Sequence, residues 1–124
     1  MKIIIALPAY NEEMILEKTV TKLVDFCQKN LALDWQIIIA DNNSTDQTAV
    51  VAKSLAEKFN LVSYLFVAQK GKGMAIKTAW ENSEADFYSF MDADLATDLS
   101  ALPPALAALQ GGFDAAIGDR KSVV

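Results

Sequence analysis

Short apolar runs alternate with amphipathic stretches along this chain of 124 residues, and that alternation most narrows the folds it can adopt. The apolar runs are rich in β-branched residues, which is typical of strands buried on both faces of a sheet. The stretches between them carry apolar residues at helical spacing. Strands and helices that alternate at this spacing form a parallel sheet with right-handed crossovers and helices on both faces.

The pattern predicts a three-layer, Rossmann-like, mostly parallel α/β fold in a single domain spanning residues 1–124. Strands are expected at residues 3–7, 35–40, 61–67, 86–91 and 113–118. Helices are expected at residues 12–30, 44–60, 73–82 and 98–111. Ser44 and Gln47 have the spacing of a capping box, which predicts that Ser44 is the N-cap of the second helix.

The residue types that the chain lacks exclude several classes of chemistry. It contains no His and one Cys, so a Ser-His-Asp triad, a His-ligated zinc site and an internal disulfide are ruled out. A metal ion would have to be bound by oxygen ligands, which favours Mg²⁺ or Mn²⁺. The single thiol, Cys27, lies in an apolar helical stretch and is expected to be buried and unreactive.

The charge balance also narrows the choice of partners. The net charge of -5 argues against nucleic-acid binding, which normally needs a basic surface. No stretch approaches the roughly 20 apolar residues of a membrane span. The first residues are typical of a strand and not of a secretory leader. We therefore expect a cytoplasmic protein that binds phosphate groups, if at all, through a metal ion, a helix N-terminus or single basic residues.

Polar residues follow each predicted strand, and ligands bind beside these carboxyl ends in open parallel sheets. Turn and capping roles explain some of these polar residues: Asn11 is expected to cap a helix, and Asn42 and Asn43 suit a left-handed turn. Asp41 has no structural role in that explanation, and its carboxylate could accept a hydrogen bond from a ring N–H or a ribose hydroxyl. The segments in chain order are Pro8-Ala9-Tyr10-Asn11-Glu12, Asp41-Asn42-Asn43-Ser44-Thr45-Asp46, Gln69-Lys70-Gly71-Lys72-Gly73, Asp92-Ala93-Asp94 and Gly118-Asp119-Arg120.

The strongest single signal is the pair Asp92 and Asp94, which follows an apolar strand. If the backbone stays extended, both carboxylates project to the same side. Two such carboxylates repel each other unless a cation lies beside them. A hard divalent cation that completes its coordination with water and phosphate oxygens fits that arrangement. The alternative is a solvated acidic loop in front of a helix that Asp98 caps.

Taken in order, the five segments resemble those of family 2 glycosyltransferases of GT-A fold, and most of all the branch that includes dolichyl-phosphate mannose synthases and dolichyl-phosphate glucosyltransferases. The resemblance covers nearly the whole chain. It implies an enzyme that transfers a sugar, with inversion, from a UDP- or GDP-sugar to an acceptor such as polyprenyl phosphate at the cytoplasmic face of the membrane. Members of the family are longer, so the resemblance implies a truncated chain, the donor-binding part without the acceptor half.

The resemblance also implies roles for individual residues. Asp41 would hydrogen-bond the base, Lys72 would lie beside the nucleotide, and Arg120 would approach the diphosphate or the sugar. Asp92 and Asp94 would form the catalytic DxD motif and bind Mg²⁺ or Mn²⁺, with Asp94 the better candidate for direct coordination. The implied nucleotide-sugar site comprises Pro8, Ala9, Tyr10, Glu12, Asp41, Gly71, Lys72, Asp92 and Arg120. The sequence departs from the family pattern at three positions, where Asn42, Ala79 and Asp119 replace the common Asp, Gly and Ser.

Two other functions compete with an active transferase. One is a non-catalytic module that keeps the nucleotide-sugar site. The other is a nucleotidyltransferase, but that class usually has a Gly-rich, Arg-containing loop after its first strand, and here that position reads Pro8-Ala9-Tyr10-Asn11. An exposed sheet edge would favour self-association into a homo-oligomer.

Overall fold

The computed structural model describes residues 2–32 and 34–93, which form a parallel sheet and three helices. The expected helix at 98–111 and strand at 113–118 lie outside the described residues, as do Asp94 and Arg120. The elements in chain order are β1 (Lys2–Ala9), α1 (Leu16–Asn30), β2 (Asp34–Asp41), α2 (Thr48–Lys58), β3 (Val62–Phe66), α3 (Lys72–Glu81) and β4 (Phe87–Phe90).

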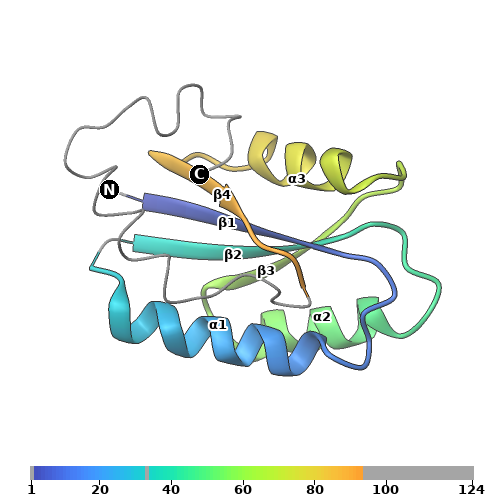
Figure 1. Ribbon diagram of the computed structural model, residues 1–124, viewed down its shortest axis with the longest axis horizontal. Helices are drawn as coiled ribbons and strands as arrows, with labels where there is room; N and C mark the ends of the chain where they lie inside the picture. Colours follow the sequence, from blue (N-terminus) through green and yellow to red (C-terminus); the bar gives the residue numbers. More distant parts are fainter. Residues whose placement is uncertain (1, 33, 94–124) are drawn as a thin grey trace.

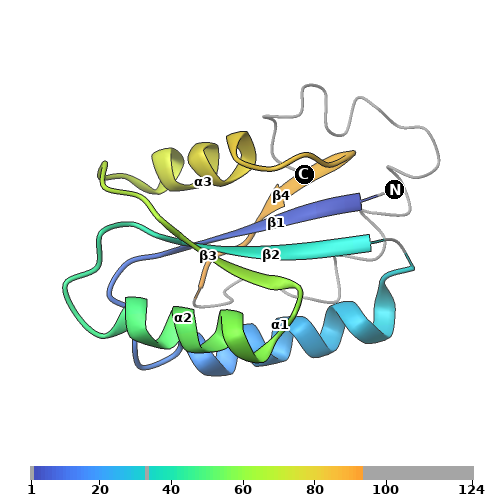
Figure 2. The ribbon, with the colours of Figure 1, turned by 180° about the vertical axis from the view of Figure 1, so that it is seen from behind.

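The sheet has the strand order β3-β2-β1-β4, and all of its strand pairs are parallel. Helices α1 and α2 cover one face, and α3 covers the other (Figure 1). The view from behind shows the same three layers (Figure 2). The expected α/β fold with helices on both faces is therefore confirmed for the described part of the chain.

The apolar run of β1 supplies side chains to both faces of the sheet. Ile3, Ile5 and Leu7 belong to the core on the α1 and α2 side, whereas Ile4 and Ala6 belong to the core under α3. All five are fully buried. The uninterrupted run follows from this position, because a central strand covered by helices on both faces has no side that contacts water.

β1 is longer than the sequence predicts. Pro8 was expected to begin the exit from the strand, but β1 continues to Ala9, and Pro8 pairs with Ala40 of β2. Proline lacks the N–H that a central strand normally donates. It is tolerated here because β4 pairs with β1 only between Ile3 and Ala6 and has ended before Pro8 is reached.

Both predicted helix caps are wrong. Helix α1 begins at Leu16 and not near residue 12, and α2 begins at Thr48 without a side-chain cap. Ser44 Oγ instead accepts a hydrogen bond from the backbone N–H of Asn11, at 3.0 Å. Asn11 Oδ1 accepts one from the backbone N–H of Thr45, at 2.8 Å. These groups join two loops instead of closing their own helices, because the sheet brings the ends of β1 and β2 side by side.

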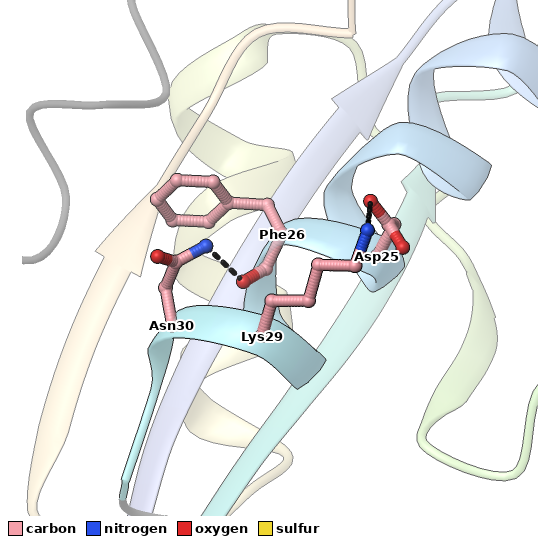
Figure 3. Close-up of polar contacts among 4 residues, drawn as sticks. All are labelled: Asp25, Phe26, Lys29 and Asn30. Carbon is pink, nitrogen blue, oxygen red and sulfur yellow. Dashed lines mark hydrogen bonds and ion pairs between the residues drawn. The ribbon is translucent and has the colours of Figure 1, made fainter.

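Helix α1 has an exposed face and a buried face. On the exposed face, Lys29 Nζ lies 3.2 Å from a carboxylate oxygen of Asp25, and Asn30 Nδ2 donates to the carbonyl of Phe26 at 3.0 Å (Figure 3). On the buried face, Cys27 is fully enclosed, and burial raises the pKa of its thiol to about 12. Within residues 2–32 and 34–93, no helix is both long and apolar enough to cross a membrane.

Candidate functional site

A pocket of about 340 Å³ lies at the carboxyl ends of β1 and β4. The chain runs from β1 through β2 to β3 on one side of β1, and then returns to place β4 on the other side. The pocket therefore lies where the strand order reverses, which is where open α/β sheets bind their ligands. It is lined by Pro8, Ala9, Tyr10, Glu12, Asn42, Lys72, Asp92 and Ala93.

The loop after β1 supplies an aromatic ring and a carboxylate to this pocket. Tyr10 is 51% exposed, so its ring is accessible to a planar ligand. The backbone N–H of Glu12 donates to Thr48 Oγ1 at 2.8 Å. Thr48 is fully buried at the start of α2 and also donates to the Asp46 carboxylate. The loop is thus held by α2, a contact that no local sequence pattern indicates.

The loop after β4 places Asp92 in the same pocket. Ala93 is buried in the core, and its carbonyl accepts a hydrogen bond from Thr19 Oγ1 of α1 at 2.6 Å. The carboxylate of Asp92 forms an ion pair with the ammonium group of Lys72. That ammonium also lies 5.2 Å from the centre of the Phe90 ring, within the range of a cation–π contact. The core thus fixes the backbone of this loop, while the Asp92 carboxylate remains at the pocket.

Asp41 has a structural role, contrary to the prediction. It is 1% exposed; its Oδ1 accepts from the backbone N–H of Ser44 at 3.0 Å, and its Oδ2 accepts from the Tyr64 hydroxyl at 2.7 Å. Burial, the hydrogen bond to Asp41 and its negative charge together raise the pKa of Tyr64 to about 12. Tyr64 could not be found from the sequence, because its partner is set by the β2–β3 pairing.

Asn42 lines the pocket but was expected to be only a turn residue. Of the two asparagines after β2, Asn43 has the left-handed backbone, with a φ of 56°, and Asn42 does not. The Asn42 side chain is directed into the loop before α3, where it hydrogen-bonds the backbone of Gln69 and Gly71. The sequence signal that could have identified Asn42 as a pocket residue is its position directly after the carboxyl end of β2.

Of the predicted site residues that the structure describes, six line the pocket and two do not. Asp41 and Gly71 are each next in sequence to a lining residue, Asn42 and Lys72, but do not line the pocket themselves. Asp94 and Arg120 lie outside the described residues. The six that line the pocket are Pro8, Ala9, Tyr10, Glu12, Lys72 and Asp92.

The described residues contain no group of three or more His, Cys, Asp or Glu side chains that could by itself hold a metal ion. The donors at the pocket are carboxylates, which suit a hard cation that takes its remaining ligands from water or phosphate. Asp92 already has a cation, the ammonium of Lys72, beside it. Carboxylate oxygens of this kind suit Mg²⁺ or Mn²⁺, but the described residues do not by themselves form a site for either ion.

An open parallel sheet with a polar pocket at its switch point is typical of nucleotide-binding α/β proteins. The model of the family described as "Glycosyl transferase family 2" matches residues 4–123. The chain belongs to this family.

Curated relatives match nearly the whole chain. Dolichol-phosphate mannosyltransferase of Pyrococcus furiosus is 29% identical over 120 residues, which are 97% of this chain and 33% of that protein. Glycosyltransferase AglD of Haloferax volcanii is 31% identical over 123 residues, which are 97% of this chain and 20% of that protein. The chain thus spans a third or less of the length of these relatives.

Solved structures share the fold. TarS of S. aureus, in a complex with UDP, superposes with a TM-score of 0.69 at 23% identity, over 90% of this chain and 32% of that one. The mannosyltransferase PcManGT of Pyrobaculum calidifontis, in complex with GDP-Man and Mn²⁺, superposes with a TM-score of 0.65 at 23% identity, over 84% of this chain and 31% of that one. The described sheet and helices are therefore part of a GT-A fold.

Proposed function

We propose that this chain is the donor-binding part of an inverting glycosyltransferase that takes a sugar from a UDP- or GDP-sugar and transfers it to an acceptor such as polyprenyl phosphate. The observation that carries the proposal is the pocket at the switch point, which brings together Tyr10 of the loop after β1, Lys72 of α3 and Asp92 of the loop after β4. Family membership supports it. In the proposal, residues 1–124 act as one donor-binding unit.

The chemistry of the pocket suits the parts of a nucleoside diphosphate. In the proposal, the base and ribose lie against Pro8, Tyr10 and Glu12, which line the pocket. The diphosphate lies beside Lys72 and the N-terminus of α3, since Lys72 is the first residue of that helix. A helix N-terminus and an ammonium group both favour phosphate oxygens.

The proposal includes Mg²⁺ or Mn²⁺ held by Asp92 and Asp94. When bound, such an ion would neutralise the negative charge that builds up on the departing nucleoside diphosphate. Asp92 would hold it on the pocket side of the β4 loop, while Lys72 and Arg120 would bind phosphate oxygens directly. A polyprenyl phosphate acceptor is already anionic, so it would depend less on a general base than a sugar hydroxyl would. The Mn²⁺ in the mannosyltransferase structure supports this part of the proposal.

Calorimetric titration of the unmodified chain with UDP and GDP, in Mn²⁺ and in EDTA, tests the donor site. We expect one nucleotide to bind, and to bind more tightly with Mn²⁺. Asp94→Asn should remove the metal-dependent part of the affinity and leave the affinity in EDTA unchanged or slightly higher, because one repelling charge is gone. Equal affinity in Mn²⁺ and EDTA for the unmodified chain would contradict the metal site, and no affinity for either nucleotide would contradict the donor site.

A second measurement separates a transferase from a binding module. Product formation from a labelled nucleotide sugar and polyprenyl phosphate would show that the chain has catalytic activity. Tight nucleotide binding without any product would favour a non-catalytic module that keeps the donor site.

A further inference from the structure

Asn42 connects the end of β2 to the loop that precedes α3. The residue is only 8% exposed. The amide nitrogen Nδ2 donates to the carbonyl of Gln69 at 2.5 Å, and Oδ1 accepts from the backbone N–H of Gly71 at 2.8 Å. The backbone N–H of Asn42 donates to the carbonyl of Ala9 at 2.8 Å, which fixes the residue to β1 as well. One side chain therefore connects two of the loops that border the pocket.

The chemistry of these two contacts requires a carboxamide. A backbone carbonyl can only accept and a backbone N–H can only donate, so the side chain must present one donor and one acceptor side by side. An aspartate in this position could accept from Gly71, but its second oxygen would face the carbonyl oxygen of Gln69. Removal of the amide would leave two backbone groups without these partners, and the loop would have to rearrange to satisfy them.

The loop that Asn42 holds determines where α3 begins, and therefore where its first residue, Lys72, lies. Gly71 has a φ of +119°, a backbone conformation that residues with side chains rarely adopt, and it directly precedes the first residue of α3. From that point the Lys72 side chain reaches Asp92 and the Phe90 ring across the pocket. Asn42, Lys72 and Asp92 all line this pocket. A shift of the Gly71 backbone would therefore move the ammonium group relative to the phosphate position.

We infer that Asn42 is a positioning residue, which acts through Gly71 to hold the Lys72 ammonium where it can bind the diphosphate of the donor. This inference rests on the proposed function. It assigns to Asn42 an effect on the diphosphate part of the ligand and none on the base.

The test compares Asn42→Ala with Asn43→Gly as a matched control. Each variant deletes one amide side chain from the same loop, but Asn43 is exposed, and glycine tolerates its positive φ. Calorimetry would measure the affinity for UDP or GDP, whichever the unmodified chain binds more tightly, and for the corresponding nucleoside. We expect Asn42→Ala to weaken diphosphate binding at least tenfold with the nucleoside affinity unchanged. We expect Asn43→Gly to change neither affinity.

Combining Asn42→Ala with Lys72→Met tests whether Asn42 acts through the lysine. If it does, Asn42→Ala should have little further effect once Lys72 has been replaced. Hydrogen exchange of the Gly71 amide, followed by NMR without any nucleotide, should be faster in Asn42→Ala than in Asn43→Gly. This last measurement reports on the loop even where binding is weak.

Three results would overturn the inference while leaving the donor site intact. These are undiminished diphosphate affinity in Asn42→Ala, an equal loss of nucleoside affinity, or an effect that is fully additive with that of Lys72→Met. Failure of the proposed function has a different signature, since the unmodified chain would then bind neither UDP nor GDP. That result would also contradict the proposed role of Asn42 in diphosphate binding.

Discussion

The ammonium group of Lys72, at the first residue of α3, forms an ion pair with the carboxylate of Asp92, just beyond β4. The two side chains are 53% and 39% exposed, so the pair is accessible to solvent at the pocket. A divalent cation that binds Asp92 must compete with this ammonium. Displacement of Lys72 would in turn release its positive charge for a phosphate group.

We predict that Lys72→Met changes the affinities for metal and for nucleotide in opposite directions. Mn²⁺ should bind about 1.4- to fivefold more tightly in the absence of nucleotide, because exposed ion pairs contribute roughly 0.2–1 kcal/mol. The affinity for the nucleoside diphosphate should fall. Mn²⁺ titration followed by electron paramagnetic resonance, together with nucleotide calorimetry, would measure both. Lys70→Met, at an exposed lysine in the loop before α3, is the control. A loss of both affinities in Lys72→Met would contradict the competition.

We predict that Asp41→Ala lowers the free energy of unfolding by about 1–3 kcal/mol, since it leaves two part-buried hydrogen-bond donors without their acceptor. Tyr64→Phe removes only one of those bonds and should cost less. Urea denaturation of both single variants and the double variant would give the coupling between the two residues. If the two losses in unfolding free energy were fully additive, that would argue against the hydrogen bond between Tyr64 and Asp41.

We predict that Asn11→Ala is less stable than Asn11→Gly. Both variants lose the hydrogen bonds from Thr45 and Asp46 to the Asn11 side chain. Only the alanine must also adopt the left-handed backbone, with a φ of 51°, which costs an ordinary residue about 1–2 kcal/mol. Thermal or urea unfolding should therefore rank the chains as unmodified, then Asn11→Gly, then Asn11→Ala. Equal stability of the two variants would show that the loop relaxes when the amide is removed.

We predict that stability declines above about pH 9 because of Cys27. Burial raises the pKa of this thiol to about 12, so the folded protein keeps its proton where the unfolded chain loses it. The contribution is complete below the pKa of the unfolded thiol and is lost as the pH rises toward 12. Unfolding free energies at pH 8 and pH 10 should differ less in Cys27→Ala than in the unmodified chain. Reaction of the native thiol with Ellman's reagent at pH 8 should also be slow, and rapid reaction would contradict its burial.

Local patterns in the sequence were enough to predict the four strands and three helices that the structure describes, apart from where α1 and α2 begin, and the edge of the sheet that carries the pocket. The run from Ile3 to Leu7 indicates a strand buried on both faces, since neither face accommodates polar residues. The polar segments after each strand predict a common edge because the carboxyl ends of parallel strands meet there. The family pattern adds the roles of Lys72 and Asp92, both of which line the pocket.

The partners of the polar groups were decided only by the tertiary structure. Ser44, Asn11 and Asp41 each had a local explanation, as a cap or as a ligand group, and each instead bonds to a residue that the strand order brings near. Asn42 bonds to a loop that follows the next strand. A hydroxyl, amide or carboxylate can satisfy itself with any donor or acceptor within reach. The sequence therefore determines which groups are polar, whereas the order β3-β2-β1-β4 determines which of them meet.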